Sequence, residues 1–256
     1  MILVIDVGNT TTQLGVFEDD KLIYEFRYIT KIERTSDEIG ALIKTFFDNV
    51  GIDMKKFEGV IISSVVPDMN YHLENGIKKY MHLNPIIVKA GIKTGINVRA
   101  ENPSEVGADR IVDVAAAYHM YKKPTIVVNF GTATRFDYVA GNGDFGVAVT
   151  SPGIKISADA LFGKASMLPN IEIKKPKSIL ASNSITSMQA GLVYGYIGHT
   201  EYIINKMKEE IGLDDIFVIA SGGYGNIIFP ETDTIDEFDP LLTLKGLKII
   251  YDKNKR

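Results

Sequence analysis

The residues best suited to chemistry lie in a short polar turn near the start of the chain. An apolar run at residues 2–5 leads into Asp6, and residues 8–12 (GNTTT) follow before a second apolar run at 14–17. Glycine lets backbone N–H groups point at phosphate oxygens, and threonine and asparagine side chains donate further hydrogen bonds. An aspartate at a strand end can hold a Mg²⁺ ion that bridges phosphates. The pattern predicts a phosphate-binding strand–turn–strand unit, and a plain hairpin with a polar turn is the alternative.

The same pattern returns in the second half of the chain. A strand predicted at residues 125–128 leads into Asn129, and the polar turn 129–134 precedes another strand at 136–139. Aligning Asp6 with Asn129 also aligns Gly8 with Gly131. We therefore predict an internal duplication with one phosphate-type turn in each half.

The composition excludes several classes of function. The 28 basic and 32 acidic residues give a formal net charge of −4, so no basic field favours nucleic acid. The absence of cysteine excludes disulfides, thiolate metal sites and cysteine nucleophiles, and favours the cytoplasm. We expect neither a signal peptide nor a membrane span, because no apolar run is long enough. The four histidines are scattered without metal-ligand spacing.

The surrounding pattern predicts elements that position the turns. Residues 21–30 alternate as a third strand, Thr35 and Glu38 are spaced as a capping box before a helix, and a buried strand at 57–66 precedes a helix opened by Pro67. Residues 107–110 (GADR) lead into another helix, and a hinge between the halves is expected within 107–124. In the second half, helices are predicted at 153–168 and 184–211. Three glycines inside the second of these predict a close packing partner.

Two such halves resemble the actin, Hsp70 and sugar-kinase superfamily. Within it, the chain is similar to type III pantothenate kinases over nearly its whole length, through DVGNT, RTSDEIG, SSVVP, NPSEVGADRIV, FGTAT, SPGIKISADALF and DPLLTLKGL. The resemblance implies an α/β fold of two duplicated actin-like (ribonuclease H-like) domains. We predict these at residues 1–115 and 116–256, each with one phosphate turn and with the nucleotide in the cleft between them.

The resemblance also implies an activity, which is ATP-dependent phosphorylation of pantothenate to 4′-phosphopantothenate, the first step of coenzyme A biosynthesis. The family's ATP contacts carry over to Asp6, Gly8, Asn9, Thr10, Thr11 and Thr132, with Mg²⁺ nearest Asp6. Its substrate contacts carry over to Gly107, Ala108, Asp109, Arg110 and Ser184. Asp109 matches the family's general base, and Arg110 beside it can grip a carboxylate. The glycine turn at 221–225 is placed to lie near the adenosine, and a plain helix-entry turn is the alternative there.

Several positions depart from the family. Asn129 stands where the family has the aspartate that binds a monovalent cation (K⁺ or NH₄⁺), and Arg135 stands where the family has threonine. Ala100 replaces a tyrosine that touches the substrate, and Thr11 replaces an asparagine. Three possibilities follow: a working pantothenate kinase with an altered cation requirement, a paralogue with lost or changed acceptor, or a nucleotide-binding or regulatory protein without turnover. Arg135 could take over the electrostatic role of the missing cation.

The family further implies a homodimer in the cytoplasm, with pantothenate as small-molecule partner. The long glycine-bearing helix at 184–211 is the predicted dimer surface. Asp113, four residues after Asp109 on the same helix face, is expected to have a structural role, with assistance to the base as the alternative.

Overall fold

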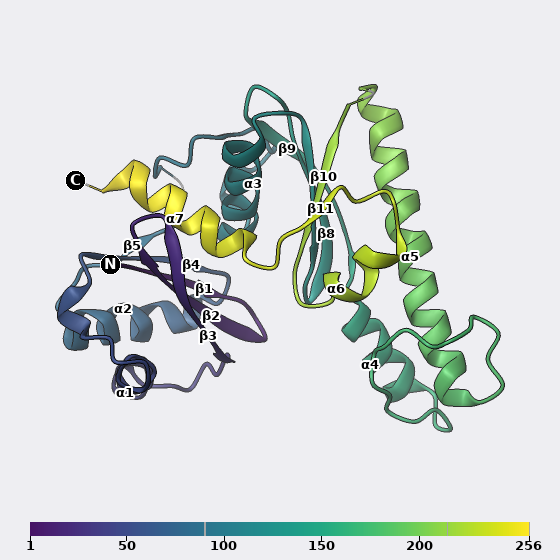
Figure 1. Ribbon diagram of the computed structural model, residues 1–256, viewed down its shortest axis with the longest axis horizontal. Coiled ribbons are helices and arrows are strands. Elements are labelled where there is room, and N and C mark those ends of the chain that lie inside the picture. Colours follow the sequence, from purple (N-terminus) through teal and green to yellow (C-terminus); the bar gives the residue numbers. More distant parts are fainter. Residues whose placement is uncertain (90, 214, 256) are drawn as a thin grey trace. The chain divides into compact units, whose positions relative to one another are not determined.

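The chain forms two compact α/β units, which Figure 1 shows as a computed structural model describing residues 1–89, 91–213 and 215–255. Unit 1 comprises Met1–Ile96, Ala100–His119 and Leu242–Arg256, and unit 2 comprises Asn97–Arg99 and Met120–Leu241. The division of the chain at residues 115 and 116 stays a prediction. The units differ from it mainly because the last helix belongs to unit 1.

Unit 1 is built on a five-stranded sheet in the order β3-β2-β1-β4-β5. Its strands are β1 (Ile2–Val7), β2 (Thr11–Glu18), β3 (Lys21–Ile29), β4 (Gly59–Ser64) and β5 (Ile86–Ile87). The first three strands pair antiparallel, whereas β4 pairs parallel with both β1 and β5. The carboxyl ends of β1 and β4 therefore meet at one edge of the sheet, with Val7 opposite Ser64.

Helices cover both faces of this sheet. They are α1 (Ser36–Asn49) and α2 (Pro67–Met81) on one face and α7 (Leu242–Asn254) on the other. Helix α3 (Ala108–Tyr121, which passes into unit 2 at its end) packs against α7, and two 3-10 turns, η1 (Met54–Lys56) and η2 (Pro103–Glu105), complete the unit. The predicted capping box at Thr35 and Glu38 is confirmed at the start of α1. Apolar residues of α1 and α2 pack on the face of β1 that carries Leu3 and Ile5. On the other face, α7 approaches Gly15 and Gly59 so closely that added Cβ atoms would meet its side chains.

Unit 2 repeats this sheet and extends it by one strand. Its order is β11-β10-β7-β8-β9-β6, formed by β6 (Asn97–Val98), β7 (Thr125–Phe130), β8 (Ala133–Val139), β9 (Asp144–Pro152), β10 (Phe217–Ser221) and β11 (Glu237–Phe238). Superposing β7 on β1 places β8, β9, β10 and β11 on β2, β3, β4 and β5, with the same parallel and antiparallel pairings. The predicted duplication is thus confirmed at the level of topology.

The helices of unit 2 are α4 (Ile154–Lys164), α5 (Ser184–Ile211) and α6 (Gly225–Ile228), followed by the 3-10 turn η3 (Phe229–Glu231). Apolar residues of α5, including Val193 and Ile204, pack on Ile126 and Val128 of β7. Among the described residues, no helix is long and apolar enough to cross a bilayer.

Two sequence-based expectations about unit 2 need correction. The second polar turn is shorter than residues 129–134, because β7 continues to Phe130 and β8 begins at Ala133. The helix expected at 153–168 ends at Lys164. Residues 141–143 (GNG) after the strand at 136–139 indicate a hairpin, but they do not give the extent of β9, because its exposed face and Gly146 break the alternation that marks a half-buried strand.

Candidate functional site

The first polar turn joins β1 to β2 and presents its side chains to solvent. Asn9, Thr10 and Thr11 are exposed, whereas Asp6, near the end of β1, is partly buried. Asp6 lies opposite Gln13 on β2 and opposite Ser63 on β4. Within the turn, the Gly8 N–H donates to the Thr11 carbonyl at 3.1 Å. The exposed amide and hydroxyl groups can therefore meet a ligand beside one carboxylate.

The GADR segment lies next to this turn, in the same unit. A Cβ atom on Gly107 would lie 3.7 Å from Val65 Cγ1, and the Val65 N–H donates to the carbonyl of Val7 at 3.0 Å. Gly107 therefore lies at the edge of the sheet where β1, the strand that carries Asp6, ends. Within unit 1, the structure thus places the start of the predicted acceptor-binding segment near the first predicted phosphate turn.

Asp109 and Arg110 occupy the first turn of α3. The Arg110 N–H donates to Asp109 Oδ1 at 2.9 Å, and the same oxygen lies 2.7 Å from the Cβ position of Gly107. A side chain at residue 107 would collide with the carboxylate, so glycine leaves room for it there. The positive end of the helix dipole favours an anion at this position.

Asp113 is buried one turn later on α3 and has a structural contact. Its Oδ1 accepts a hydrogen bond from the Thr243 hydroxyl of α7 at 2.5 Å. The contact joins the helix that carries Asp109 to the helix packed on β1, which bears out the structural role.

The second polar turn repeats the strand pairings of the first with a loop that is one residue shorter. Asn129 lies opposite Arg135 on β8 and opposite Ser221 on β10, as Asp6 lies opposite Gln13 and Ser63. The Gly131 N–H donates to the Ala133 carbonyl at 3.2 Å, and Thr132 is exposed. The Asn129 amide oxygen lies 3.1 Å from the Cβ position of Gly131. An amide oxygen therefore stands where the family has a carboxylate.

The third glycine turn packs directly on the second polar turn. Gly222 has φ +93°, and a Cβ atom there would lie 2.6 Å from the Phe130 carbonyl oxygen. Only glycine fits both the backbone conformation and the contact. Contact of this turn with adenosine stays a prediction.

Ser184 is the first residue of α5 in unit 2 and is exposed. The helix is capped by Asn183, whose side chain accepts from the Thr186 N–H at 3.0 Å, so the Ser184 hydroxyl is not used as the cap. Ala100 belongs to unit 1, together with Gly107–Arg110. The structure describes Ser184 and the GADR segment separately, each in its own unit.

Sequence reasoning missed two residues behind the first turn. Thr12 is fully buried on β2 and Thr30 follows β3, and their hydroxyl oxygens lie 3.0 Å apart. Thr30 also donates from its hydroxyl to the Gly8 carbonyl at 2.8 Å. The sequence shows only that Thr30 ends an alternating strand. No motif distinguishes this threonine from an ordinary strand residue, so its contact with the turn could not be predicted.

A metal ion would find a single carboxylate at the first turn. No group of three histidine, aspartate or glutamate side chains suited to a metal occurs among the residues that the structure describes. Asp6 fits Mg²⁺, because this ion is usually bound by one or two carboxylates together with substrate phosphates.

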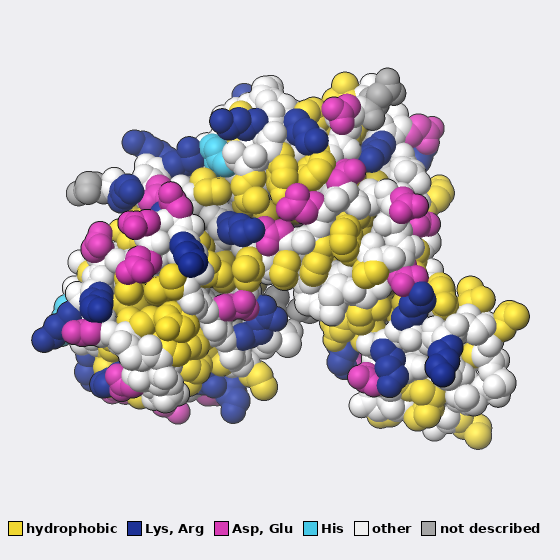
Figure 2. Space-filling model, in the orientation of Figure 1, with side chains coloured by type: hydrophobic (Ala, Val, Ile, Leu, Met, Phe, Trp, Pro, Cys, Tyr) yellow, Lys and Arg dark blue, Asp and Glu magenta, His cyan; other side chains and the backbone are white. Residues whose placement is uncertain are grey.

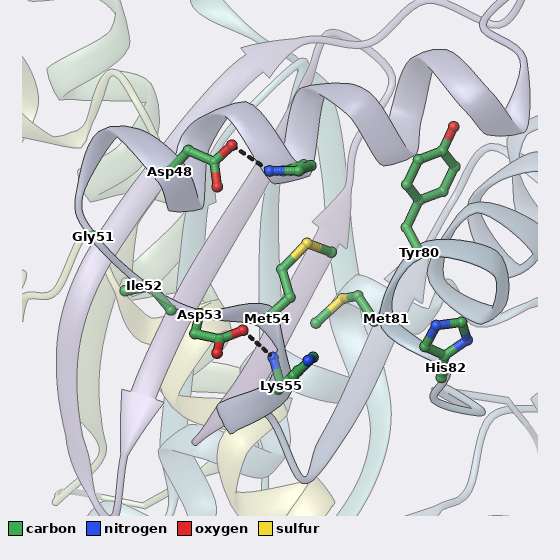
Figure 3. Close-up of a pocket in the computed structure, with 10 residues that line it drawn as sticks. Asp48, Gly51, Ile52, Asp53, Met54, Lys55, Tyr80, Met81 and His82 are labelled. Atoms are coloured by element: carbon green, nitrogen blue, oxygen red, sulfur yellow. Dashed lines mark hydrogen bonds and ion pairs between the residues drawn. The ribbon is translucent and has the colours of Figure 1, made fainter.

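A pocket of about 530 Å³ lies elsewhere in unit 1, between the ends of α1 and α2 and η1 (Figure 3). Its lining includes Lys44, Asp48 and Asp53, and none of the predicted site residues. Asp48 accepts from Lys44, and Asp53 accepts from the Lys55 N–H, so both carboxylates serve the local fold. We therefore locate the candidate site at the polar turns.

Comparisons with known proteins agree with this assignment. Residues 2–206 match the family model described as type III pantothenate kinase. The chain is 53% identical over 256 residues to a type III pantothenate kinase of Agathobacter rectalis, covering 100% of this chain and 98% of that protein.

Two solved structures share the fold at low identity. A Sinorhizobium meliloti protein described as a 2-dehydro-3-deoxygalactonokinase has a TM-score of 0.64 at 11% identity, covering 100% of this chain and 97% of that one. Component A of (R)-2-hydroxyglutaryl-CoA dehydratase from Acidaminococcus fermentans has a TM-score of 0.54 at 11% identity, covering 98% and 96%. These likenesses support two duplicated actin-like domains. Because residues 2–206 match the family model and a relative is 53% identical over the whole chain, the chain belongs to the type III pantothenate kinase family.

Proposed function

We propose that this chain transfers the γ-phosphoryl group of ATP to the primary hydroxyl of pantothenate, giving 4′-phosphopantothenate for coenzyme A biosynthesis. One observation carries the proposal. Gly107, at the head of the GADR segment, lies against Val65, which is hydrogen-bonded to the last residue of the strand that holds Asp6. A phosphate-binding turn and an acceptor-binding helix start therefore share one sheet edge.

The first turn would bind the phosphates of ATP. The side chains of Asn9, Thr10 and Thr11 are exposed there, and Asp6 would hold the Mg²⁺ ion that neutralises phosphate charge. In unit 2, the exposed Thr132 would supply a further contact.

The start of α3 would bind and activate the acceptor. Asp109 would accept the proton of the pantothenate hydroxyl, and Arg110 would pair with the pantothenate carboxylate. Gly107 and Ala108 would leave space for the substrate, and Ser184 would contribute a hydroxyl. Most of the acceleration in phosphoryl transfer comes from positioning and charge neutralisation, so a single base suffices.

A monovalent cation is the cofactor that these residues support least. Asn129 offers an amide oxygen in place of a charged carboxylate, and Arg135 stands directly opposite it across the β7–β8 pair. We infer that the guanidinium supplies positive charge at this turn and that turnover does not require K⁺ or NH₄⁺.

A second candidate is a kinase of the same fold with another acceptor. The observations that favour it are the loss of the aspartate at Asn129 and of the aromatic ring at Ala100. ATP binding would then be kept while pantothenate is not phosphorylated.

One experiment separates these possibilities. The purified chain is titrated by calorimetry with ATP and Mg²⁺, then with pantothenate, and the mixture is analysed by mass spectrometry for 4′-phosphopantothenate. Formation of the phosphorylated product supports the proposal. ATP binding without that product supports a different acceptor, and no ATP binding supports a role without turnover.

The proposed assembly is a homodimer in the cytoplasm. Gly191, Gly195, Gly198 and Tyr202 share one face of α5, because they are spaced by three or four residues. Added Cβ atoms on the three glycines would meet no described atom of this chain within 4 Å, and Tyr202 is 71% exposed. We therefore propose that the packing partner predicted from these helical glycines is a second copy of the chain.

A second apolar surface lies nearby in unit 2. Exposed hydrophobic side chains occur on α4 and in the segment that leads to α5, namely Leu161, Phe162, Met167, Ile179 and Leu180. Figure 2 shows hydrophobic atoms on the lobe that carries α4. Large hydrophobic side chains that are exposed in this number are candidates for an interface, and we include them in the proposed dimer.

A further inference from the structure

Thr30, the residue that follows β3, makes two hydrogen bonds to the first polar turn. The Thr30 backbone N–H donates to the carbonyl of Thr10 at 3.0 Å, and its hydroxyl donates to the carbonyl of Gly8 at 2.8 Å. One residue thus binds two carbonyl oxygens of the turn. Both carbonyls therefore point toward Thr30.

Thr12 completes this arrangement. Its hydroxyl oxygen lies 3.0 Å from that of Thr30, and the residue is fully buried on β2. A hydroxyl has one proton to donate, and that of Thr30 goes to Gly8. Thr12 must therefore be the donor to Thr30, which fixes the direction of the chain from Thr12 through Thr30 to the Gly8 carbonyl.

The equivalent position in unit 2 is Gly153, which also donates a hydrogen bond to its polar turn. Gly153 follows β9 as Thr30 follows β3, and its N–H donates to the Thr132 carbonyl at 3.1 Å, as Thr30 donates to Thr10. A Cβ atom on Gly153 would lie 2.3 Å from the Thr132 oxygen and 2.4 Å from the Gly131 oxygen. Both turns thus accept a backbone hydrogen bond from this position, and the first turn accepts a second one from the Thr30 hydroxyl.

We propose that Thr30 is a positioning residue for the phosphates of ATP, an inference that rests on the proposed function. Carbonyl oxygens are the negative ends of peptide dipoles and repel phosphate, whereas N–H groups attract it. Thr30, which is partly buried, donates to the carbonyl oxygens of Gly8 and Thr10. With these two oxygens hydrogen-bonded, the exposed side chains of Asn9 and Thr10 remain available to the ligand.

The decisive variant is Thr30→Val, which keeps the side-chain shape and the backbone N–H but removes the hydroxyl. The variant loses the hydrogen bond to the Gly8 carbonyl and the one received from Thr12, and because only the first of these contacts the turn, we expect ATP to bind about 3- to 10-fold more weakly. The KM for pantothenate and the affinity for adenosine, which lacks phosphates, should not change. Thr30→Ser should restore ATP affinity to within about twofold, because the donor is returned. Calorimetry measures ATP, and ligand-observed NMR measures adenosine.

Thr45→Val is the matched control. The Thr45 hydroxyl also donates to a backbone carbonyl at 2.8 Å, that of Ala41, but on the exposed face of α1. It should leave ATP affinity unchanged. Equal ATP binding by Thr30→Val and the parent chain would overturn the inference, as would parallel losses for ATP and adenosine, or failure of Thr30→Ser to restore binding. A parent chain that binds no ATP would overturn the proposed function as well, and this is seen before any variant is made.

Discussion

Asp109 is the residue on which the proposed chemistry depends most directly. Its Oδ1 accepts from the Arg110 N–H at 2.9 Å, a bond that an asparagine oxygen can also accept. Asp109→Asn should therefore keep the local structure while losing the ability to take a proton. We expect kcat to fall about 100- to 10,000-fold with ATP affinity unchanged, measured by steady-state kinetics and calorimetry.

Asp68→Asn is the control for this change. Asp68 is the first-turn acid of α2, so its replacement alters the same helix-dipole interaction in a different helix. Its kcat should equal that of the parent chain. An Asp109→Asn variant that retains full kcat would remove Asp109 from the role of general base.

The pair Asn129 and Arg135 allows a test of the cation proposal. The double variant Asn129→Asp, Arg135→Thr replaces the opposed pair with the residue types of the family. Turnover should become dependent on K⁺, whereas the parent chain should show equal rates in K⁺ and in a bulky organic cation. Rates are compared at fixed ionic strength, because salt screens charge in both proteins. A parent chain that already requires K⁺ would contradict the proposal.

At the scale of elements, a glycine-to-alanine substitution is expected to destabilise the protein beside a polar turn and to stabilise it within an exposed helix. Gly153→Ala would bring a Cβ atom to 2.3 Å from the Thr132 carbonyl oxygen, so the turn must shift. Overpacking of this kind costs about 1–3 kcal/mol. Because a chain of this size loses roughly 2–4 °C per kcal/mol, calorimetry should show a Tm several degrees lower.

Gly163→Ala is expected to have the opposite sign. Gly163 lies in α4, and a Cβ atom there would meet no described atom within 4 Å. Alanine in a helix is better than glycine by about 0.5–1 kcal/mol, so the Tm should rise. A Gly153→Ala protein as stable as the parent chain would show that the turn can move freely.

At the scale of the whole molecule, the glycine face of α5 is the surface that we propose for the dimer. Gly195→Arg places a long charged side chain on the open glycine face, which a partner helix could no longer approach. Light scattering should then show a monomer where the parent chain is a dimer. Thr45→Arg puts the same side chain on the exposed face of α1 and should leave the dimer intact. A parent chain that is monomeric at micromolar concentration would refute the dimer itself.

Much of the fold could be predicted because its signals are local. The capping box at Thr35 and Glu38, Pro67 at the start of α2 and the apolar runs of β1 and β7 depend on neighbours within a few residues. Residues 141–143 (GNG) likewise indicate a hairpin, whereas the extent of β9 depends on its contacts with β8 and β6. The packing of α7 within unit 1 leaves no local signal, since its packing partners are more than 100 residues away in sequence.

By itself the sequence determined the chemistry available to this protein: two polar turns, one with a carboxylate and one with an amide, and an Asp-Arg pair at a helix start. These residue types are properties of the sequence and do not depend on the fold. The tertiary structure alone decided that Gly107 lies against Val65 at the edge where β1 ends, and that Thr30 binds the carbonyls of Gly8 and Thr10. Both depend on strand pairing across long stretches of sequence, and hydrogen bonds to backbone carbonyls leave no pattern in the residues that accept them.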